Sequence, residues 1–168
     1  ISGTGNAWTN NVTLVGWQLF NKTPAAITTY DSGTGSATAG AFMSYGSPAS
    51  NERSLGGLAS GGAYFGSPAS GTVAGWIAVG FTNNTGSTIT SFNVAFDGEQ
   101  WRNGGNVTSQ SMVLQYGEGA SFTMVSNWIT PGGNFGWSSP ISTATTAAVD
   151  GNGAGKVSGK GGVISGLT

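Results

Sequence analysis

The stretch TITSFNVAFDG (residues 88–98) decides the fold class that we predict for this chain. Its large apolar residues Phe92, Val94 and Phe96 alternate with small or polar residues. Successive side chains of a β-strand point to opposite faces, so a strand here places all three large residues on one face. The stretch therefore predicts a half-buried strand, and the Asp97-Gly98 pair at its end predicts a turn.

Further strands are expected on both sides of this one. The apolar run WIAVGFTNN (76–84) precedes it across the turn residues NNTGS (83–87), and these two strands form the clearest predicted pair. Downstream, GEG (117–119) predicts a hairpin turn between two alternating segments. The remaining predicted strands lie at residues 11–20, 26–33, 111–119 and 121–128.

The composition supports an all-β fold. The 31 glycines disfavour helices and suit short strands that are joined by tight turns. No stretch combines helical periodicity with a helix cap. The similar segments YGSPAS (45–50) and FGSPAS (65–70) predict two strand ends, at Pro48 and Pro68. We predict one domain over residues 1–168, an antiparallel β-sandwich with a jelly-roll-like topology.

The charge content excludes some classes of partner. Charged residues make up 7% of the chain and the net charge is −1, so the chain lacks the basic surface that binds nucleic acid. No apolar stretch of about 18 residues predicts membrane insertion. Since a net charge near zero promotes association between copies, we expect a homo-oligomer or a polymer.

The residue types argue against an enzyme. Histidine and cysteine are absent, which excludes disulfides, thiolate chemistry and a Ser-His-Asp triad. A glycosidase needs two facing carboxylates. Asp97 and Glu99 would share a strand face, but the turn predicted at Asp97-Gly98 separates them. We therefore expect no catalytic residue and no cofactor.

The segment DGNGAG (150–155) weakly resembles a calcium-binding loop. Asp150 and Asn152 could supply oxygen ligands, but a tight calcium site usually needs several carboxylates. A glycine-rich turn is therefore the favoured interpretation, and calcium binding stays a weak alternative.

Two short segments each place an acidic and a basic residue close together, NERSLGG (51–57) and GEQWRNGG (98–105). One interpretation is a polar surface that recognises a ligand. The favoured interpretation is a structural ion cluster, because buried ions are tolerated only when they are paired. The expected pairs are Glu52 with Arg102 and Arg53 with Glu99. The members of the cluster are Glu52, Arg53, Glu99, Trp101 and Arg102.

Aromatic side chains and asparagines suggest contacts with carbohydrate. Sugar-binding modules use exposed aromatic faces, although tryptophan is usually buried and these residues could instead close the end of the core. The candidate glycan platform, in the segment NWITPGGNFGWSS (127–139), is Trp128, Phe135 and Trp137. N-x-S/T glycosylation patterns occur at Asn11, Asn21, Asn83 and Asn106, in a chain rich enough in Asn and Thr to produce them by chance.

The segments NERSLGG (51–57), VGFTNNTGSTITSFNVAFDGEQWRNGG (79–105), LQYGEG (114–119) and VDGNG (149–153) resemble a domain family of secreted bacterial proteins that carry PEP-CTERM-type sorting tails. The resemblance implies an extracellular or cell-surface β-sandwich and carries no catalytic residue. It also implies further strands before residue 1 and after residue 168. A sheet without them would invite a strand from another copy.

Together these features predict a non-enzymatic, extracellular structural or adhesive protein, a filament or matrix subunit that is completed by strand exchange between copies. The alternative is a carbohydrate-binding module that uses the exposed aromatic residues and binds a polysaccharide. Ice binding is less favoured, because the chain has no regular T-x-T ladder.

Overall fold

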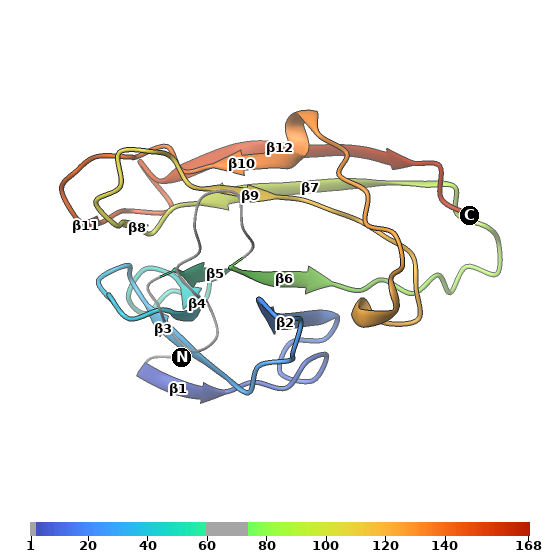
Figure 1. Cartoon of the computed structure of the whole chain (residues 1–168), viewed down its shortest axis with the longest axis horizontal. Helices are drawn as coiled ribbons and strands as arrows, with labels where there is room; N and C mark the ends of the chain where they lie inside the picture. The colour runs from blue at the N-terminus through green and yellow to red at the C-terminus, as the bar shows by residue number, and fades with distance from the viewer. Residues whose placement is uncertain (1–2, 60–73) are drawn as a thin grey trace. The chain divides into compact units, whose positions relative to one another are not determined.

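The computed structural model describes residues 3–59 and 74–168, and this part of the chain is all-β (Figure 1). It contains two short 3-10 helices and no α-helix, which confirms the predicted fold class. None of its helices is long and apolar enough to cross a membrane. The elements are β1 (Gly3–Ala7), β2 (Trp17–Asn21), β3 (Thr29–Gly33), β4 (Ala41–Tyr45), β5 (Ser54–Leu58), β6 (Gly75–Val79), β7 (Ser91–Glu99), β8 (Arg102–Asn103), β9 (Ser111–Val113), η1 (Phe122–Met124), η2 (Gly133–Phe135), β10 (Gly136–Ser138), β11 (Ala147–Ala148) and β12 (Lys156–Ser165).

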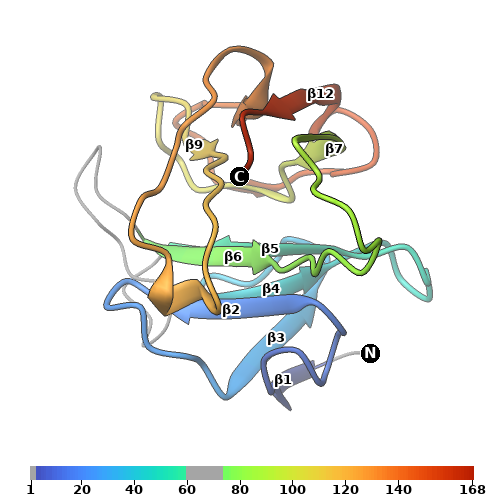
Figure 2. The same ribbon diagram turned by 90° about the vertical axis from the view of Figure 1, so that its right-hand side faces the viewer.

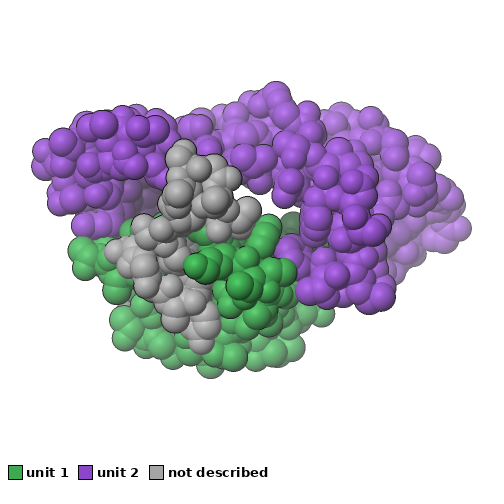
Figure 3. Space-filling model, viewed as in Figure 1, with its two compact units in different colours: residues 1–81 green, residues 82–168 purple. Residues whose placement is uncertain are grey.

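The chain forms two compact units, residues 1–81 and residues 82–168, which Figure 3 shows in green and purple. The position of one unit relative to the other is not determined, and each is described by itself. The prediction of one domain over residues 1–168 stays a prediction.

The described residues of the first unit, 3–59 and 74–81, form two sheets. The larger has the strand order β1-β3-β4-β5, and the smaller pairs β2 with β6 (Figure 2). The pairings are antiparallel except for β3 with β4, which is parallel and places Asp31 opposite Met43. The predicted antiparallel topology therefore holds for most of this unit, and β3–β4 departs from it.

Both sheets contribute to one buried cluster in the first unit. Leu19 on β2 and Phe42 on β4 are fully buried, and Trp8 meets Tyr30 edge-on with 5.7 Å between ring centroids. The Trp8 indole N–H donates to Asn10 Oδ1 at 2.6 Å, so this buried donor is satisfied. Burial of these large side chains is the main stabilising term for the unit.

The strand predicted at residues 11–20 is only half right. β2 begins at Trp17, and residues 10–16 form a turn and bend in which the Asn11 side chain accepts the Gly16 N–H at 2.8 Å. Val12 and Val15 are exposed there, at 71% and 82%. The apolar run predicted a strand, but the hydrogen bond between the Asn11 side chain and the Gly16 backbone stabilises a turn instead.

The second unit is built around the long ribbon of β7 and β12, which lie side by side in Figure 1. Exposure alternates along β7, with Phe92, Val94 and Phe96 half-buried and the residues between them exposed, as the alternation predicted. Short strands pair as β9 with β10 and β8 with β11. β10 also lies close to β12.

Three local predictions for this part of the chain are wrong. β6 pairs with β2 and β7 pairs with β12, so the segments 76–84 and 88–98 do not form a hairpin with each other. The segment 121–128 contains the 3-10 helix η1, and a bridge between Tyr116 and Ile129 replaces the hairpin predicted at GEG. Alternation alone does not reveal which strand lies opposite.

β4 ends before Pro48, as predicted, whereas Pro68 lies outside the described residues.

Candidate functional site

The segment GEQWRNGG (98–105) contains the end of β7 and the whole of β8, and it carries a buried tryptophan. Trp101 is 4% exposed, and its indole N–H donates to Glu99 Oε2 at 2.8 Å. The ring lies directly against Gly151, where any Cβ would overlap ring atoms. Glu99 therefore satisfies the indole of a buried aromatic side chain, and Gly151 is required by close packing.

Two amide side chains of the same segment bind the chain at residues 141–145. Gln100 is 7% exposed; its Nε2 donates to Ile141 O at 2.7 Å and its Oε1 accepts the Ile141 N–H at 2.9 Å. Asn103 is buried, and its Nδ2 donates to Thr143 O at 3.0 Å and to Thr145 O at 2.6 Å. The segment thus acts as a structural clamp.

The two amides are not among the residues predicted for this segment, which are Glu99, Trp101 and Arg102. The sequence does carry a signal, because Gln and Asn side chains near a tryptophan can satisfy irregular backbone through both a donor and an acceptor. An uncharged amide also carries a smaller cost of burial than an ion. The clamp in this segment is therefore formed largely by Gln100 and Asn103.

The predicted ion cluster draws on both compact units. Glu52 and Arg53 lie in the first unit, and Glu99 and Arg102 lie in the second. In the first unit, Arg53 Nε donates to Ser44 Oγ at 3.1 Å, and Arg53 Nη2 donates to Ser44 O. The pairing of Glu52 with Arg102 and of Arg53 with Glu99 stays a prediction.

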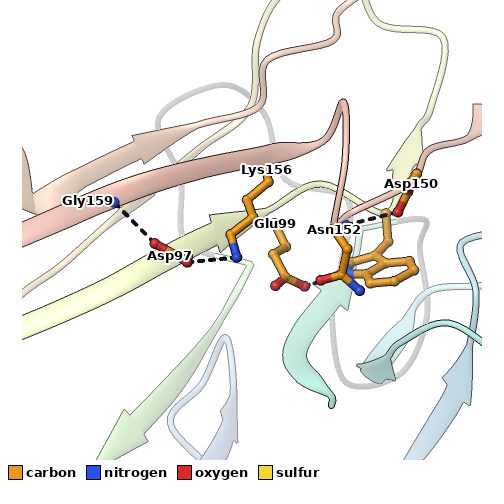
Figure 4. Close-up of polar contacts among 7 residues, drawn as sticks. Asp97, Glu99, Asp150, Asn152, Lys156 and Gly159 are labelled. Carbon is orange, nitrogen blue, oxygen red and sulfur yellow. Dashed lines mark hydrogen bonds and ion pairs between the residues drawn. The ribbon is translucent and has the colours of Figure 1, made fainter. Parts of the chain in front are cut away.

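An exposed ion pair bridges the two strands of the ribbon. Lys156 Nζ lies 2.9 Å from Asp97 Oδ2, and the Gly159 N–H donates to Asp97 Oδ1 at 3.1 Å (Figure 4). The bond from Lys156, followed by the bond from Gly159, holds the pKa of Asp97 below its ordinary value of 3.8. Asp97 is therefore a carboxylate at neutral pH.

The turn predicted at Asp97-Gly98 is wrong, because β7 continues through both residues to Glu99. Asp97 and Glu99 consequently project from the same face of the strand. Their oxygens bind Lys156, Gly159 and Trp101, contacts that position the strand end. A general acid needs a carboxyl group whose pKa is raised, and the pKa of Asp97 is lowered instead.

The segment 150–155 forms a tight turn. Asp150 Oδ1 accepts the Asn152 N–H at 3.0 Å, and Asp150 O accepts the Gly155 N–H at 2.8 Å. In residues 3–59 and 74–168 no group of three or more Asp or Glu side chains could hold a metal ion. These contacts agree with the interpretation as a glycine-rich turn.

The three residues of the predicted glycan platform differ in their surroundings. Trp137 is half-buried with its ring against Gly98 of β7, and Phe135 packs near Gly162 of β12. Trp128 is 38% exposed and packs on Phe122, with 5.1 Å between ring centroids. Trp128 is therefore the member whose ring is most accessible to a ligand.

The asparagines of the glycosylation patterns close local turns. In three of them the side-chain oxygen accepts the N–H of the threonine two positions later, and Asn11 accepts the Gly16 N–H instead. Such Asx turns stabilise loops by themselves. The three are Asn21, Asn83 and Asn106. Glycosylation stays a prediction.

The backbone of β7 has one edge that faces β12 and one outer edge. The Gln100 N–H donates to Gly155 O, and Thr90 O accepts the Leu167 N–H, so even-numbered residues at both ends of the strand point toward β12. The register shift falls within β12, so this alternation continues along β7. Successive residues direct their N–H and C=O groups to opposite sides, and the odd-numbered residues therefore point to the outer edge.

Within the described ranges, no strand pairs with this edge, and nothing bonds to the outward backbone of Ser91, Asn93 and Ala95. The opposite edge of the ribbon differs. There Asn134 Nδ2 donates to Gly159 O at 2.8 Å and to Gly161 O at 3.1 Å, so a side chain covers part of the β12 edge. The ribbon thus has one edge that is partly covered and one that is open.

Comparison of the chain with protein-family models, with curated proteins and with solved structures gives no match. The candidate site is therefore interpreted from its own geometry.

Proposed function

We propose that this chain is a non-enzymatic, extracellular structural or adhesive subunit that assembles by adding strands between copies. The observation that carries the proposal is the open outer edge of β7. Residues 88–96 contain no charged residue, proline or glycine, the features with which proteins usually protect an edge strand. A jelly-roll-like β-sandwich is the topology proposed for the chain.

The low charge supports this proposal. With a net charge of −1 and few ions, copies of the chain repel one another weakly. The roles found for Glu99, Gln100, Trp101 and Asn103 also support a non-enzymatic function, because each of these side chains satisfies a neighbouring part of the fold.

Electron microscopy and size-exclusion chromatography with light scattering test the proposal. We expect the chain to form oligomers or filaments as its concentration rises, and Ala95→Lys to suppress them by placing a charge at the edge. Ser109→Lys adds the same charge at an exposed position outside the strand and should leave assembly unchanged. Strictly monomeric particles at high concentration would refute the proposal.

Carbohydrate binding is the second candidate, and the exposed Trp128 beside Phe122 favours it. Aromatic faces of this kind stack on sugar rings. An affinity gel containing a polysaccharide would retard the chain, and Trp128→Ala would remove the retardation. Equal mobility in all gels would exclude this candidate.

A further inference from the structure

We propose that the occupant of the β7 edge is β7 of a second copy, paired antiparallel about a two-fold axis at Val94. This inference rests on the proposed function and specifies its partner and register. In such a contact the same surface meets itself, and each residue pair occurs twice.

The backbone of the edge suits this pairing. Ser91, Asn93, Ala95 and Asp97 have odd numbers and direct their N–H and C=O groups outward. With the axis at Val94, Asn93 lies opposite the partner's Ala95, and Ser91 lies opposite the partner's Asp97. Residues that are opposed in this way exchange both backbone hydrogen bonds. The contact therefore satisfies backbone groups of Ser91, Asn93 and Ala95 to which nothing in residues 3–59 and 74–168 bonds.

The charges permit this register. Asp97 is the first charged residue after a stretch that is uncharged from Ser54 to Phe96. An axis at Asp97 would place the carboxylates of the two copies opposite each other, which is unfavourable. The axis at Val94 instead places each Asp97 opposite a serine, and each carboxylate keeps its own Lys156 at 2.9 Å.

The apolar side chains favour the same register. Phe92, Val94 and Phe96 share one face of β7. With the axis at Val94, Phe92 lies opposite the partner's Phe96, and Val94 lies opposite the partner's Val94. Cross-strand aromatic pairs stabilise antiparallel strands more than alanine pairs do. Axes at Asn93 or Ala95 would pair each phenylalanine with a smaller residue.

Partner chemistry follows from this geometry. A charged peptide would find no opposite charge at the edge between Ser91 and Phe96, whereas a second copy brings an equally uncharged strand. The two-fold contact closes on itself and yields a dimer. A longer assembly would join such dimers through other surfaces.

The absence of cysteine allows a clean crosslinking test. Under mild oxidation, Val94→Cys should shift most of the chain from the monomer to a disulfide-linked dimer, because facing residues in this register lie within disulfide reach. Asn93→Cys alone and Ala95→Cys alone should stay monomeric, since neither position faces itself. An equal mixture of these two variants should form the dimer. Ser109→Cys, in an exposed loop, is the matched control and should stay monomeric.

The outcomes separate this inference from the proposed function. Assembly of the unmodified chain without a Val94→Cys crosslink would overturn the two-fold contact and leave the proposed function standing. A crosslink of Asn93→Cys with itself would overturn the register. Crosslinking of Ser109→Cys to the same extent as Val94→Cys would show non-specific collision and overturn the contact. Failure of the unmodified chain to associate at any concentration would overturn both.

Discussion

Replacing Gln100 by alanine tests the clamp most directly. The side chain is 7% exposed and makes three hydrogen bonds, two with Ile141 and one from Nε2 to Arg102 O at 3.1 Å. Alanine removes all three and leaves the backbone groups of Ile141 without these partners. The position thereby reports whether the amide holds the segment 141–145 in place.

The expected loss follows from these contacts. A net contribution of about 0.5–1.5 kcal/mol for each hydrogen bond gives about 1.5–4.5 kcal/mol for the three. Ordering a glutamine side chain costs up to about 2 kcal/mol, which alanine recovers in part. Water can also reach the half-buried Ile141 and Arg102 in the variant. We therefore expect Gln100→Ala to lower the free energy of unfolding by about 2–3 kcal/mol.

Equilibrium unfolding in urea measures this loss, and hydrogen exchange at the Ile141 amide measures its local effect. Gln110→Ala is the matched control, because Gln110 is exposed and its side chain makes one bond, from Nε2 to Thr108 O at 3.1 Å. We expect Gln110→Ala to change stability by less than about 0.5 kcal/mol, as exposed substitutions usually do. Equal stability of the two variants, with unchanged exchange at Ile141, would refute the clamp.

Two further predictions concern the same end of the ribbon. Gly151→Ala should destabilise the fold by about 1–3 kcal/mol or more, because its Cβ would overlap the Trp101 ring. Gly104 has open space around it, so Gly104→Ala is the control and should change the melting temperature little. Equal melting temperatures for the two variants would contradict the close packing. The ion pair of Asp97 with Lys156 should stabilise the fold fully above the ordinary aspartate pKa of 3.8 and lose this effect as the pH falls through the lowered pKa of the folded chain. Asp97→Asn should remove that part of the pH dependence of the urea midpoint, and identical pH profiles for the two proteins would contradict the role of the pair.

The all-β class could be predicted because it depends on local properties. Glycine content and the alternation of Phe92, Val94 and Phe96 both act through the backbone of nearby residues. The same local rules fail where two preferences compete. At residues 10–16 an apolar run suggested a strand, and the side-chain bond of Asn11 to Gly16 produces a turn instead.

The candidate site could be predicted only in part. The ion cluster predicted for GEQWRNGG stays a prediction, and the contacts of this segment come from Glu99, Gln100 and Asn103. Most of these bonds come from the amides of Gln100 and Asn103. They could not be predicted, because their partners lie some 40 residues further along the chain. Nothing in the local sequence reveals which distant carbonyl groups need a donor.

The sequence by itself determined the all-β class, the absence of thiol and imidazole chemistry, and the apolar face of β7. These properties follow from residue types and from the period of a strand, which do not depend on distant residues. The tertiary structure decided which strands pair, that Asp97 lies within β7 rather than in a turn, and that no strand of the described residues pairs with the outer edge of β7. Pairing depends on long-range backbone hydrogen bonds, and every strand offers the same backbone groups whatever its side chains.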